Sequence, residues 1–227
     1  MNNDTSGAVS IDLVEQGMRT LAHDWRNVLN GINLRISSAQ MADEPGELET
    51  DLGEAHELIV SATKELGRLS RRIAKPTVSA IPYPIAHFVE DTSHFLRQNV
   101  GTNADRIKWE DTAGEGKVLV DFAAVSAAMG ELIDNTFRYV PAAESVTINV
   151  ARDGEFLRVS WSENHLGDPP TPDWGKVPFF TTQRGRLGLG LYFANRVMEA
   201  HNGSLLFEFS TTTRVLQTSF RLPLENS

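Results

Sequence analysis

Apolar side chains recur with a helical period through the first part of the chain. Between residues 11 and 41 they follow steps of three and four, at Leu21, Trp25, Val28, Leu29, Ile32 and Ile36. At about 100° per residue these positions form a stripe roughly 100° wide, which predicts one long helix. On such a helix His23 lies about 200° from Leu21, so its side chain is predicted to point outward, with Asn27 one turn further on.

A second helix with a continuous apolar seam follows a break at Pro45 and Gly46. The seam alternates steps of four and three, at Leu48, Leu52, Ala55, Ile59, Ala62, Leu66, Leu69 and Ile73. The two helices together predict an antiparallel hairpin. A single hairpin has too little surface of its own to bury both stripes. Two copies that pair as a four-helix bundle would bury them, so we expect a homodimer.

The pattern changes to mixed α/β beyond the proline-rich stretch 75–84. Helices are predicted over 84–99, 122–139 and 188–201, and strands over 106–111, 117–121, both arms of 145–163, and a final hairpin. Asp121 is placed to cap the second of these helices. A loop of more than twenty residues, about 164–187, is long enough to suggest a functional role. The expected domains are a hairpin over 1–76, a linker over 77–84 and an α/β sandwich over 85–227.

The composition fits a folded protein without nucleic-acid or membrane partners. The chain has 227 residues, of which 41% are hydrophobic and 22% charged, and its formal net charge is −9, so no nucleic-acid partner is expected. It has no cysteine, which excludes disulfides and thiolate metal sites. No apolar run approaches the roughly 20 residues that span a bilayer, and the polar start lacks a signal-peptide core. We therefore expect a soluble cytoplasmic protein.

The stretch "ELIDNTFRYVP" (131–141) places candidate magnesium and phosphate ligands on a predicted helix. Glu131 and Asn135 are four residues apart and share a face, and Arg138 lies one turn beyond Asn135. An acid, an amide oxygen and a cation on one face could hold a hydrated Mg²⁺ ion and a polyphosphate. An ordinary solvated helix face would carry the same residue types, and this stretch alone does not decide between the two.

Two further stretches flank the predicted helix 188–201. In "GRLGLGL" (185–191) the glycines let the backbone approach a phosphate beside a helix N-terminus, although the Walker pattern is absent. In "PFFTT" (178–182) an apolar pair precedes Thr181 and Thr182, which suits a lid over a ligand. Simple loop packing would explain this second stretch equally well.

Taken in order, these motifs resemble those of two-component sensor histidine kinases over nearly all of residues 10–224. "LAHDWRN" (21–27) resembles the phosphoacceptor box of that family, and the other three stretches resemble its N box, F box and second glycine box. The resemblance implies a dimerisation and histidine phosphotransfer hairpin followed by a Bergerat-type (GHKL) ATP-binding sandwich, with a mixed sheet and helices on one face. It also implies ATP-dependent phosphorylation of His23 and transfer of the phosphoryl group to an aspartate of a response regulator.

The resemblance implies a role for each matching residue. His23 would be the phosphoacceptor, Asp24 would help to take its proton, and Asn27 would orient a water molecule during dephosphorylation of the regulator. ATP and Mg²⁺ are the implied cofactors, with Asn135 as the metal ligand. The implied nucleotide-binding residues are Glu131, Asn135, Arg138, Tyr139, Glu163, Gly167, Thr181, Thr182, Gly185, Gly188, Leu189 and Gly190.

The first glycine box of the family, Asp-x-Gly-x-Gly, is altered in this chain. The aligned stretch is "SENHLGDPP" (162–170), in which Glu163 stands where the adenine-binding Asp is expected and His165 replaces the first glycine. Only Gly167 remains, and the His165 ring adds bulk near the expected adenine pocket. A dimeric histidine phosphotransferase with a vestigial ATP site is therefore the alternative interpretation. A GHKL-type binding module or an ATPase has less support, because neither needs a hairpin that bears a histidine.

Overall fold

The computed structural model describes residues 11–140, 144–182 and 186–225. The described chain divides into two compact units. The first unit consists of the residues up to Ala74 together with Val177–Leu189, and the second of Lys75–Lys176 together with the residues from Gly190 onward.

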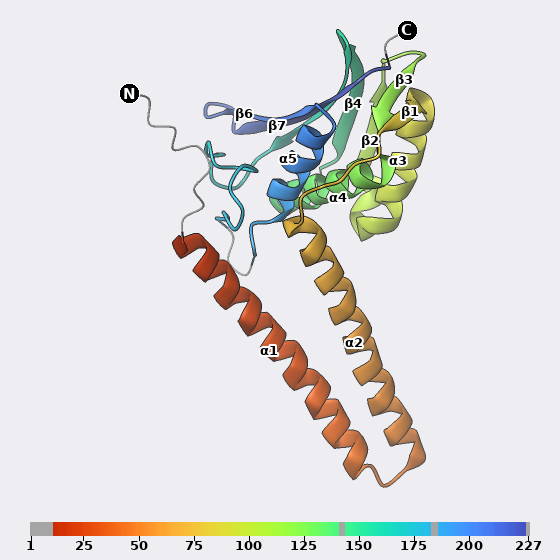
Figure 1. Cartoon of the computed structure of the whole chain (residues 1–227), viewed down its shortest axis with the longest axis vertical. Helices are drawn as coiled ribbons and strands as arrows, with labels where there is room; N and C mark the ends of the chain where they lie inside the picture. The colour runs from red at the N-terminus through yellow and green to blue at the C-terminus, as the bar shows by residue number, and fades with distance from the viewer. Residues whose placement is uncertain (1–10, 141–143, 183–185, 226–227) are drawn as a thin grey trace. The chain divides into compact units, whose positions relative to one another are not determined.

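A helical hairpin forms most of the first unit. Helices α1 (Ile11–Met41) and α2 (Pro45–Ile73) run antiparallel beside each other (Figure 1), as the apolar periodicity predicts. Pro45 occupies the first turn of α2, where a missing backbone N–H costs nothing. Arg35 of α1 links the two helices through Asp51 at 3.5 Å and Glu54 at 2.7 Å.

The hairpin leaves a large part of its apolar surface uncovered. On α2, five of the eight predicted seam positions are exposed by 42% to 50%: Leu48, Leu52, Ile59, Leu66 and Ile73. On α1, Leu29 and Ile36 are exposed by 54% and 39%. Only Ala55 of the predicted seam is fully buried within the hairpin. The hairpin therefore covers only part of the seam and leaves most of its large side chains exposed.

A five-stranded mixed sheet forms one layer of the second unit. Its strands are β2 (Ile107–Asp111), β4 (Val146–Asp153), β5 (Phe156–Asn164), β6 (Ser204–Ser210) and β7 (Val215–Pro223). Their order is β2-β4-β5-β7-β6, in which β2 runs parallel to β4 and the other neighbours are antiparallel. The β4–β5 turn follows Asp153, and Gly154 supplies its positive φ of 62°. This arrangement confirms the mixed sheet that was expected.

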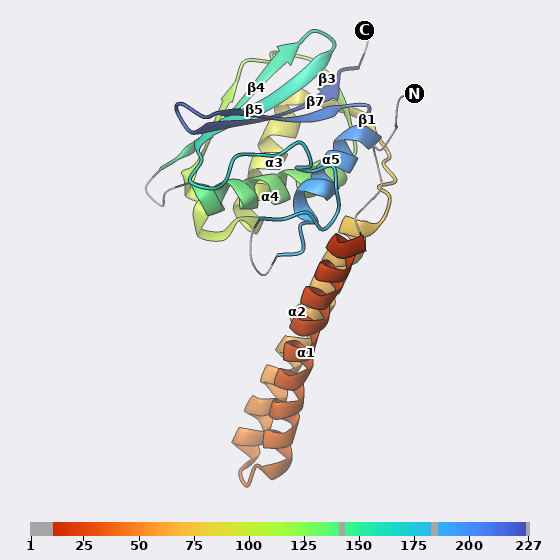
Figure 2. The ribbon, with the colours of Figure 1, turned by 90° about the vertical axis from the view of Figure 1, so that its left-hand side faces the viewer.

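Three helices cover one face of this sheet (Figure 2): α3 (Ile85–Asn99), α4 (Phe122–Tyr139) and α5 (Gly190–Ala200). A short 3-10 helix (Gly101–Arg106) connects α3 to β2. The core between the layers consists of fully buried side chains from both. They include Phe88 of α3, Met129 of α4, Val197 of α5 and the sheet residues Val159 and Phe220. The fold is thus a helical region followed by an α/β sandwich with helices on one face.

The predicted cap of α4 is present. The Asp121 carboxylate accepts hydrogen bonds from the backbone N–H of Ala124 at 3.1 Å and of Ser79 at 3.0 Å. Burial alone would raise the pKa of Asp121, but these backbone donors stabilise its charged form and lower the pKa below the ordinary 3.8. The cap therefore joins the start of α4 to the segment that precedes the sandwich.

Two element boundaries differ from the sequence prediction. Strand β1 (Ile81–Pro84) lies inside the range predicted as linker and pairs antiparallel with β3 (Lys117–Val120). Its two prolines hide it from a propensity reading, but an edge strand tolerates residues that donate no hydrogen bond. Helix α5 begins at Gly190 and not at 188, because Gly188 has a φ of 65°, which is incompatible with a right-handed helix.

Candidate functional site

His23 lies on the exposed face of α1, as predicted. Its side chain is 68% exposed. Nδ1 of the ring lies 3.3 Å from Asp24 Oδ1 and 3.3 Å from the amide nitrogen of Asn27. The three residues predicted for the phosphoacceptor box are therefore in contact with one another through a single ring nitrogen.

Nδ1 of His23 lies near both a carboxylate oxygen and an amide nitrogen, so the contacts are compatible with either tautomer of the neutral ring, including the one with its proton on Nδ1. A carboxylate only accepts hydrogen bonds, so a proton on Nδ1 would be donated to Asp24. The lone pair of the neutral ring then lies on Nε2, at the far side of the imidazole. An exposed nitrogen with a lone pair can act as a nucleophile toward an electrophile that approaches from solvent.

The predicted N box lies on α4 and meets the start of α5. A Cβ atom added to Gly190 would lie 2.7 Å from Glu131 Oε2, so the absence of a side chain lets the first residue of α5 approach this carboxylate. Asn135 is half-buried one turn further along α4. Residues that are 59 positions apart in sequence, Glu131 and Gly190, thus become neighbours.

A magnesium ion and a polyphosphate would find suitable groups at this junction. The amide oxygen of Asn135 and the carboxylate of Glu131 are hard oxygen donors, which Mg²⁺ prefers. The first N–H groups of the eleven-residue helix α5 are free of intrahelical partners and attract anions. Within the described residues no cluster of three or more His, Asp or Glu side chains is arranged to hold a metal. The donor set therefore fits an ion that is completed by water and phosphate oxygens.

Arg138, which was expected to meet phosphate, is engaged within α4. Its Nη2 atom lies 2.5 Å from Asp134 Oδ2, one turn earlier on the helix. Its side chain is 30% exposed, so the ion pair is open to solvent on one side. A phosphate at Arg138 would have to compete with Asp134 for the guanidinium group.

The described part of residues 177–189 folds back on itself. Gly188 packs so closely on Phe180 that an added Cβ atom would lie 2.4 Å from the Phe180 carbonyl oxygen. Thr181 is half-buried, Thr182 is exposed, and Leu189 is buried at 2% exposure. Gly185, which was expected to contact phosphate, lies outside the described residues.

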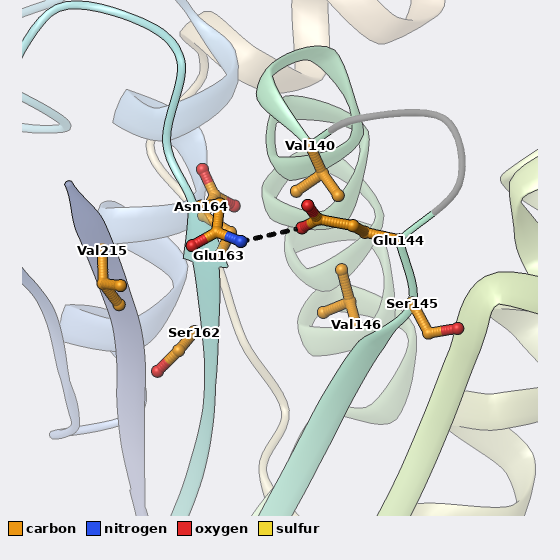
Figure 3. A pocket seen from close by; sticks show the side chains of 8 residues that line it. All are labelled: Val140, Glu144, Ser145, Val146, Ser162, Glu163, Asn164 and Val215. Carbon is orange, nitrogen blue, oxygen red and sulfur yellow. Dashed lines mark hydrogen bonds between the residues drawn. The ribbon is translucent and has the colours of Figure 1, made fainter. Parts of the chain in front are cut away.

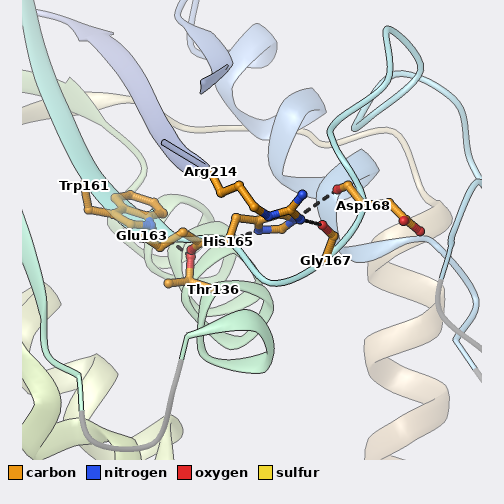
Figure 4. A network of polar contacts seen from close by, with 7 residues as sticks. All are labelled: Thr136, Trp161, Glu163, His165, Gly167, Asp168 and Arg214. Carbon is orange, nitrogen blue, oxygen red and sulfur yellow. Dashed lines mark hydrogen bonds and ion pairs between the residues drawn. The ribbon is translucent and has the colours of Figure 1, made fainter. Parts of the chain in front are cut away.

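The altered first glycine box forms a buried polar network, shown in Figure 4. Glu163 at the end of β5 and His165 just beyond it are 4% and 0% exposed. Their contact joins His165 Nδ1 to Glu163 Oε1 at 2.8 Å, and His165 Nε2 lies 3.0 Å from the carbonyl oxygen of Asp168. The Tyr139 ring packs on the imidazole with centroids 4.4 Å apart. Tyr139 and Glu163, both predicted nucleotide-binding residues, are therefore brought together around His165.

Gly167 is required by space and not by a positive φ. An added Cβ atom would lie 2.3 Å from Tyr139 Cε1. The carbonyl of Gly167 accepts a hydrogen bond from Arg214 Nη2 at 2.6 Å, and the backbone N–H of His165 donates to the Arg214 carbonyl at 2.9 Å. His165 does not have a positive φ, so it replaces a glycine without backbone strain.

Asp168, Trp174 and Arg214 belong to this network but were not foreseen. They lie in the loop after β5 and in the β6–β7 turn, and no sequence motif marks them. In the structure Arg214 has a positive φ of 54°, which is uncommon for a residue with a side chain and marks an unusual turn. A further link that periodicity does not reveal is the buried hydrogen bond from Trp161 Nε1 on β5 to Thr136 Oγ1 on α4, at 2.9 Å.

A small pocket of about 180 Å³ lies where β4, β5 and β7 meet the end of α4 (Figure 3). Asn164 donates to Glu144 Oε2 at 3.1 Å across it. The lining residues are Val140, Glu144, Ser145, Val146, Ser162, Glu163, Asn164 and Val215. Glu163 Oε2 is buried and has no hydrogen-bond partner in the described structure.

Comparison with known proteins confirms the resemblance to two-component sensor histidine kinases. Residues 120–226 match the family of histidine kinase-, DNA gyrase B- and HSP90-like ATPases. The sensor protein TdiS of Thauera aromatica is 25% identical over 210 residues, which are 87% of this chain and 37% of that protein. The sensor protein kinase PilS of Pseudomonas aeruginosa is 26% identical over 82% of this chain and 36% of its own length. The chain thus spans little more than a third of these relatives.

A solved structure shares the fold. The histidine kinase ThkA, in complex with the response regulator protein TrrA, superposes with a TM-score of 0.60 at 15% identity, over 95% of this chain and 63% of that one. Among the described residues, no helix combines the length and apolar character needed to cross a membrane.

Proposed function

We propose that this chain, a homologue of two-component sensor histidine kinases, phosphorylates its own His23 with ATP and passes the phosphoryl group to a response regulator. The observation that carries the proposal is the exposed imidazole of His23, whose Nδ1 is held by an adjacent carboxylate. The matched ATPase family over residues 120–226 supports the source of the phosphoryl group.

The chemistry assigned to His23 uses the tautomer with its proton on Nδ1, next to Asp24. Nε2 attacks the γ-phosphorus of ATP, an N–P bond forms, and the bond to the bridging oxygen of ADP breaks. Asp24 accepts the Nδ1 proton as the ring becomes positively charged. In the second step a carboxylate oxygen of the regulator attacks the same phosphorus, and the N–P bond breaks. Asn27 is assigned to orient a water molecule that releases the phosphoryl group from the regulator.

The α4–α5 junction is assigned to the phosphates. Bound Mg²⁺ would neutralise phosphate charge, with Asn135 as its ligand and Glu131 holding its water shell. The N-terminus of α5 at Gly190 would bind phosphate oxygens, and Arg138 would join them after leaving Asp134. Gly185, Gly188 and Leu189 are assigned to the nucleotide, and Thr181 and Thr182 belong to the stretch that suits a lid.

A homodimer is part of the proposal. Five large apolar side chains of the α2 seam, between Leu48 and Ile73, are exposed on an isolated hairpin, and a second copy presents the same surface. Burial of each such aliphatic side chain contributes roughly 1.5–3 kcal/mol when it leaves water completely. Two hairpins would then form the four-helix bundle that the apolar pattern predicts.

A response regulator is the proposed partner. The support is the ThkA structure, which contains a response regulator protein bound to a histidine kinase of the same fold. An exposed His23 on the side of a helical hairpin is accessible to such a partner.

Incubation with γ-labelled ATP and Mg²⁺ tests the proposal. We expect acid-labile label on the wild type, no label on His23→Ala, and normal labelling of the control His56→Ala, which changes an exposed histidine of α2. Label that persists in His23→Ala would contradict the assignment.

The phosphotransferase alternative keeps one specific observation in its favour, which is the His165 ring beside Glu163. In that case ATP would not label the chain, but a phosphorylated receiver domain would transfer label to His23.

A further inference from the structure

The surroundings of His165 are those of a bound heteroaromatic ligand. Its ring is completely buried, and its Nδ1 atom lies at hydrogen-bond distance, 2.8 Å, from Glu163 Oε1. One face packs on Tyr139, and the edges of two more rings, Trp174 and Phe209, approach at centroid distances of 5.9 and 6.0 Å. A carboxylate and an aromatic cage recognise a planar ring that carries an N–H donor.

The imidazole satisfies this site only in part. Glu163 Oε1 is used by His165, whereas Oε2 is buried and has no hydrogen-bond partner in the described structure. An unpaired buried carboxylate oxygen is costly, so a ligand that donates to it would gain an interaction that His165 does not provide. A planar base with an amino group next to a ring nitrogen carries more donors and more stacking surface than an imidazole.

We propose that His165 is an internal ligand of the base-binding site, which occupies the Glu163 carboxylate and the Tyr139 face until an amino-bearing purine nucleotide displaces it. This inference rests on the proposed function, because the family resemblance behind that function implies that Glu163 and Tyr139 bind the nucleotide. His165 thus sets the nucleotide affinity of the chain through competition.

The backbone hydrogen bonds around His165 do not depend on its ring. The backbone N–H of His165 donates to Arg214, and the Arg214 side chain holds the Gly167 carbonyl. These two bonds do not involve the imidazole. Rotation about the side-chain torsions of His165 breaks the hydrogen bonds to Glu163 and to the Asp168 carbonyl together with the ring contacts, and leaves the backbone bonds in place.

A positioning role for His165 predicts that its removal lowers nucleotide affinity, whereas an internal ligand predicts that its removal raises it. If His165 instead positioned Glu163 for the base, its removal would release the longer glutamate side chain and weaken nucleotide binding. The two roles are therefore separated by the sign of one change in affinity.

The test measures the dissociation constant of ADP by calorimetry for wild type, His165→Gly and His165→Ala, with His87→Ala, an exposed histidine of α3, as the control. We expect both His165 variants to bind ADP at least about tenfold more tightly, because a site that is open in about a tenth of the molecules binds about tenfold more weakly. The same variants should gain less affinity for inosine diphosphate, which lacks the amino group, than for ADP. Unchanged or weaker binding of ADP by folded His165 variants would overturn the proposal, and so would a failure of every variant to bind.

A second measurement covers variants that fail to fold. In the wild-type chain, saturating ADP should shift the ring proton resonances of His165 away from the position imposed by the Tyr139 ring, and resonances that do not move would overturn the proposal. Labelling of His23 is scored separately. If the His165 variants bind ADP more tightly but His23 is not labelled, the kinase function is overturned and the internal ligand stands. If His23 is labelled but the variants do not bind ADP more tightly, the internal ligand is overturned and the kinase function stands.

Discussion

Three histidines show how surroundings decide what an imidazole does. His23 is 68% exposed and contacts only short polar neighbours through Nδ1, which suits a nucleophile. His165 is fully buried against a carboxylate and a tyrosine ring, which suits a ligand. His201 donates from Nδ1 to the Val197 carbonyl at 2.7 Å and accepts at Nε2 from the backbone N–H of Asp121, which makes it a structural residue.

Two of these three roles can be derived from the sequence. The helical angle from Leu21 places His23 outward, and the position of His201 at a helix end predicts its bond to a carbonyl oxygen. The environment of His165 cannot be derived, because Tyr139, Trp174 and Phe209 come from separate elements that meet only in the folded sandwich.

A methyl group added at Gly190 should weaken nucleotide binding and leave the stability of the fold almost unchanged. In Gly190→Ala the new methyl would collide with the end of the Glu131 side chain, which can rotate away at little cost. We expect the melting temperature to change little and the affinity for ADP with Mg²⁺ to fall about tenfold, which is about 1.4 kcal/mol. Gly67→Ala, on α2 with no atom near its added methyl, is the control and should leave the affinity as it is. Equal affinities for the two variants would remove Glu131 from the phosphate site.

At the scale of elements, periodicity predicts most helices and strands, and backbone constraints explain the exceptions. The ranges of α1, α2 and α4 agree with those that the sequence predicts. The late start of α5 and the strand β1 depend on Gly188 and on pairing with β3, which no local pattern encodes.

The cap at Asp121 should make α4 sensitive to acid. Because the folded-state pKa of Asp121 is lowered, its contribution to stability is fully present above the ordinary pKa of 3.8 and is lost as the pH falls through the folded-state value. We expect Asp121→Ala to lose about 1 kcal/mol at neutral pH, as is usual for a lost cap. Urea unfolding of both proteins from neutral pH to pH ~3 should show this difference shrinking with acid. A difference independent of pH would show that the charge of Asp121 does not stabilise the helix.

At the scale of the whole molecule, the two units carry separate parts of the proposed reaction. The hairpin carries His23, the proposed phosphoacceptor, and the sandwich carries the α4–α5 junction and the His165 network. The order of the motifs in the sequence is enough to suggest this division. The contact of His165 with Glu163 and Tyr139 cannot be foreseen in this way, since "SENHLGDPP" shows only that the family pattern is broken.

The uncovered seam of the hairpin predicts association. Sedimentation at micromolar concentration should give twice the mass of the chain. Ile59→Glu, in the middle of the exposed seam, should shift the equilibrium to monomers, because a charge would be buried in an apolar interface. Val60→Glu changes the neighbouring residue off the seam and should leave a dimer. A monomeric wild type would contradict the four-helix bundle.

The most direct test of the central claim is the location of the phosphoryl group after reaction with ATP and Mg²⁺. Trypsin cleaves after Arg19 and Arg26 and releases the peptide "TLAHDWR", which contains His23 as its one histidine. We expect this peptide to carry a single phosphoryl group that fragmentation places on His23, that acid removes and that base leaves in place. A phosphoryl group on any other residue, or one that resists acid, would contradict the account.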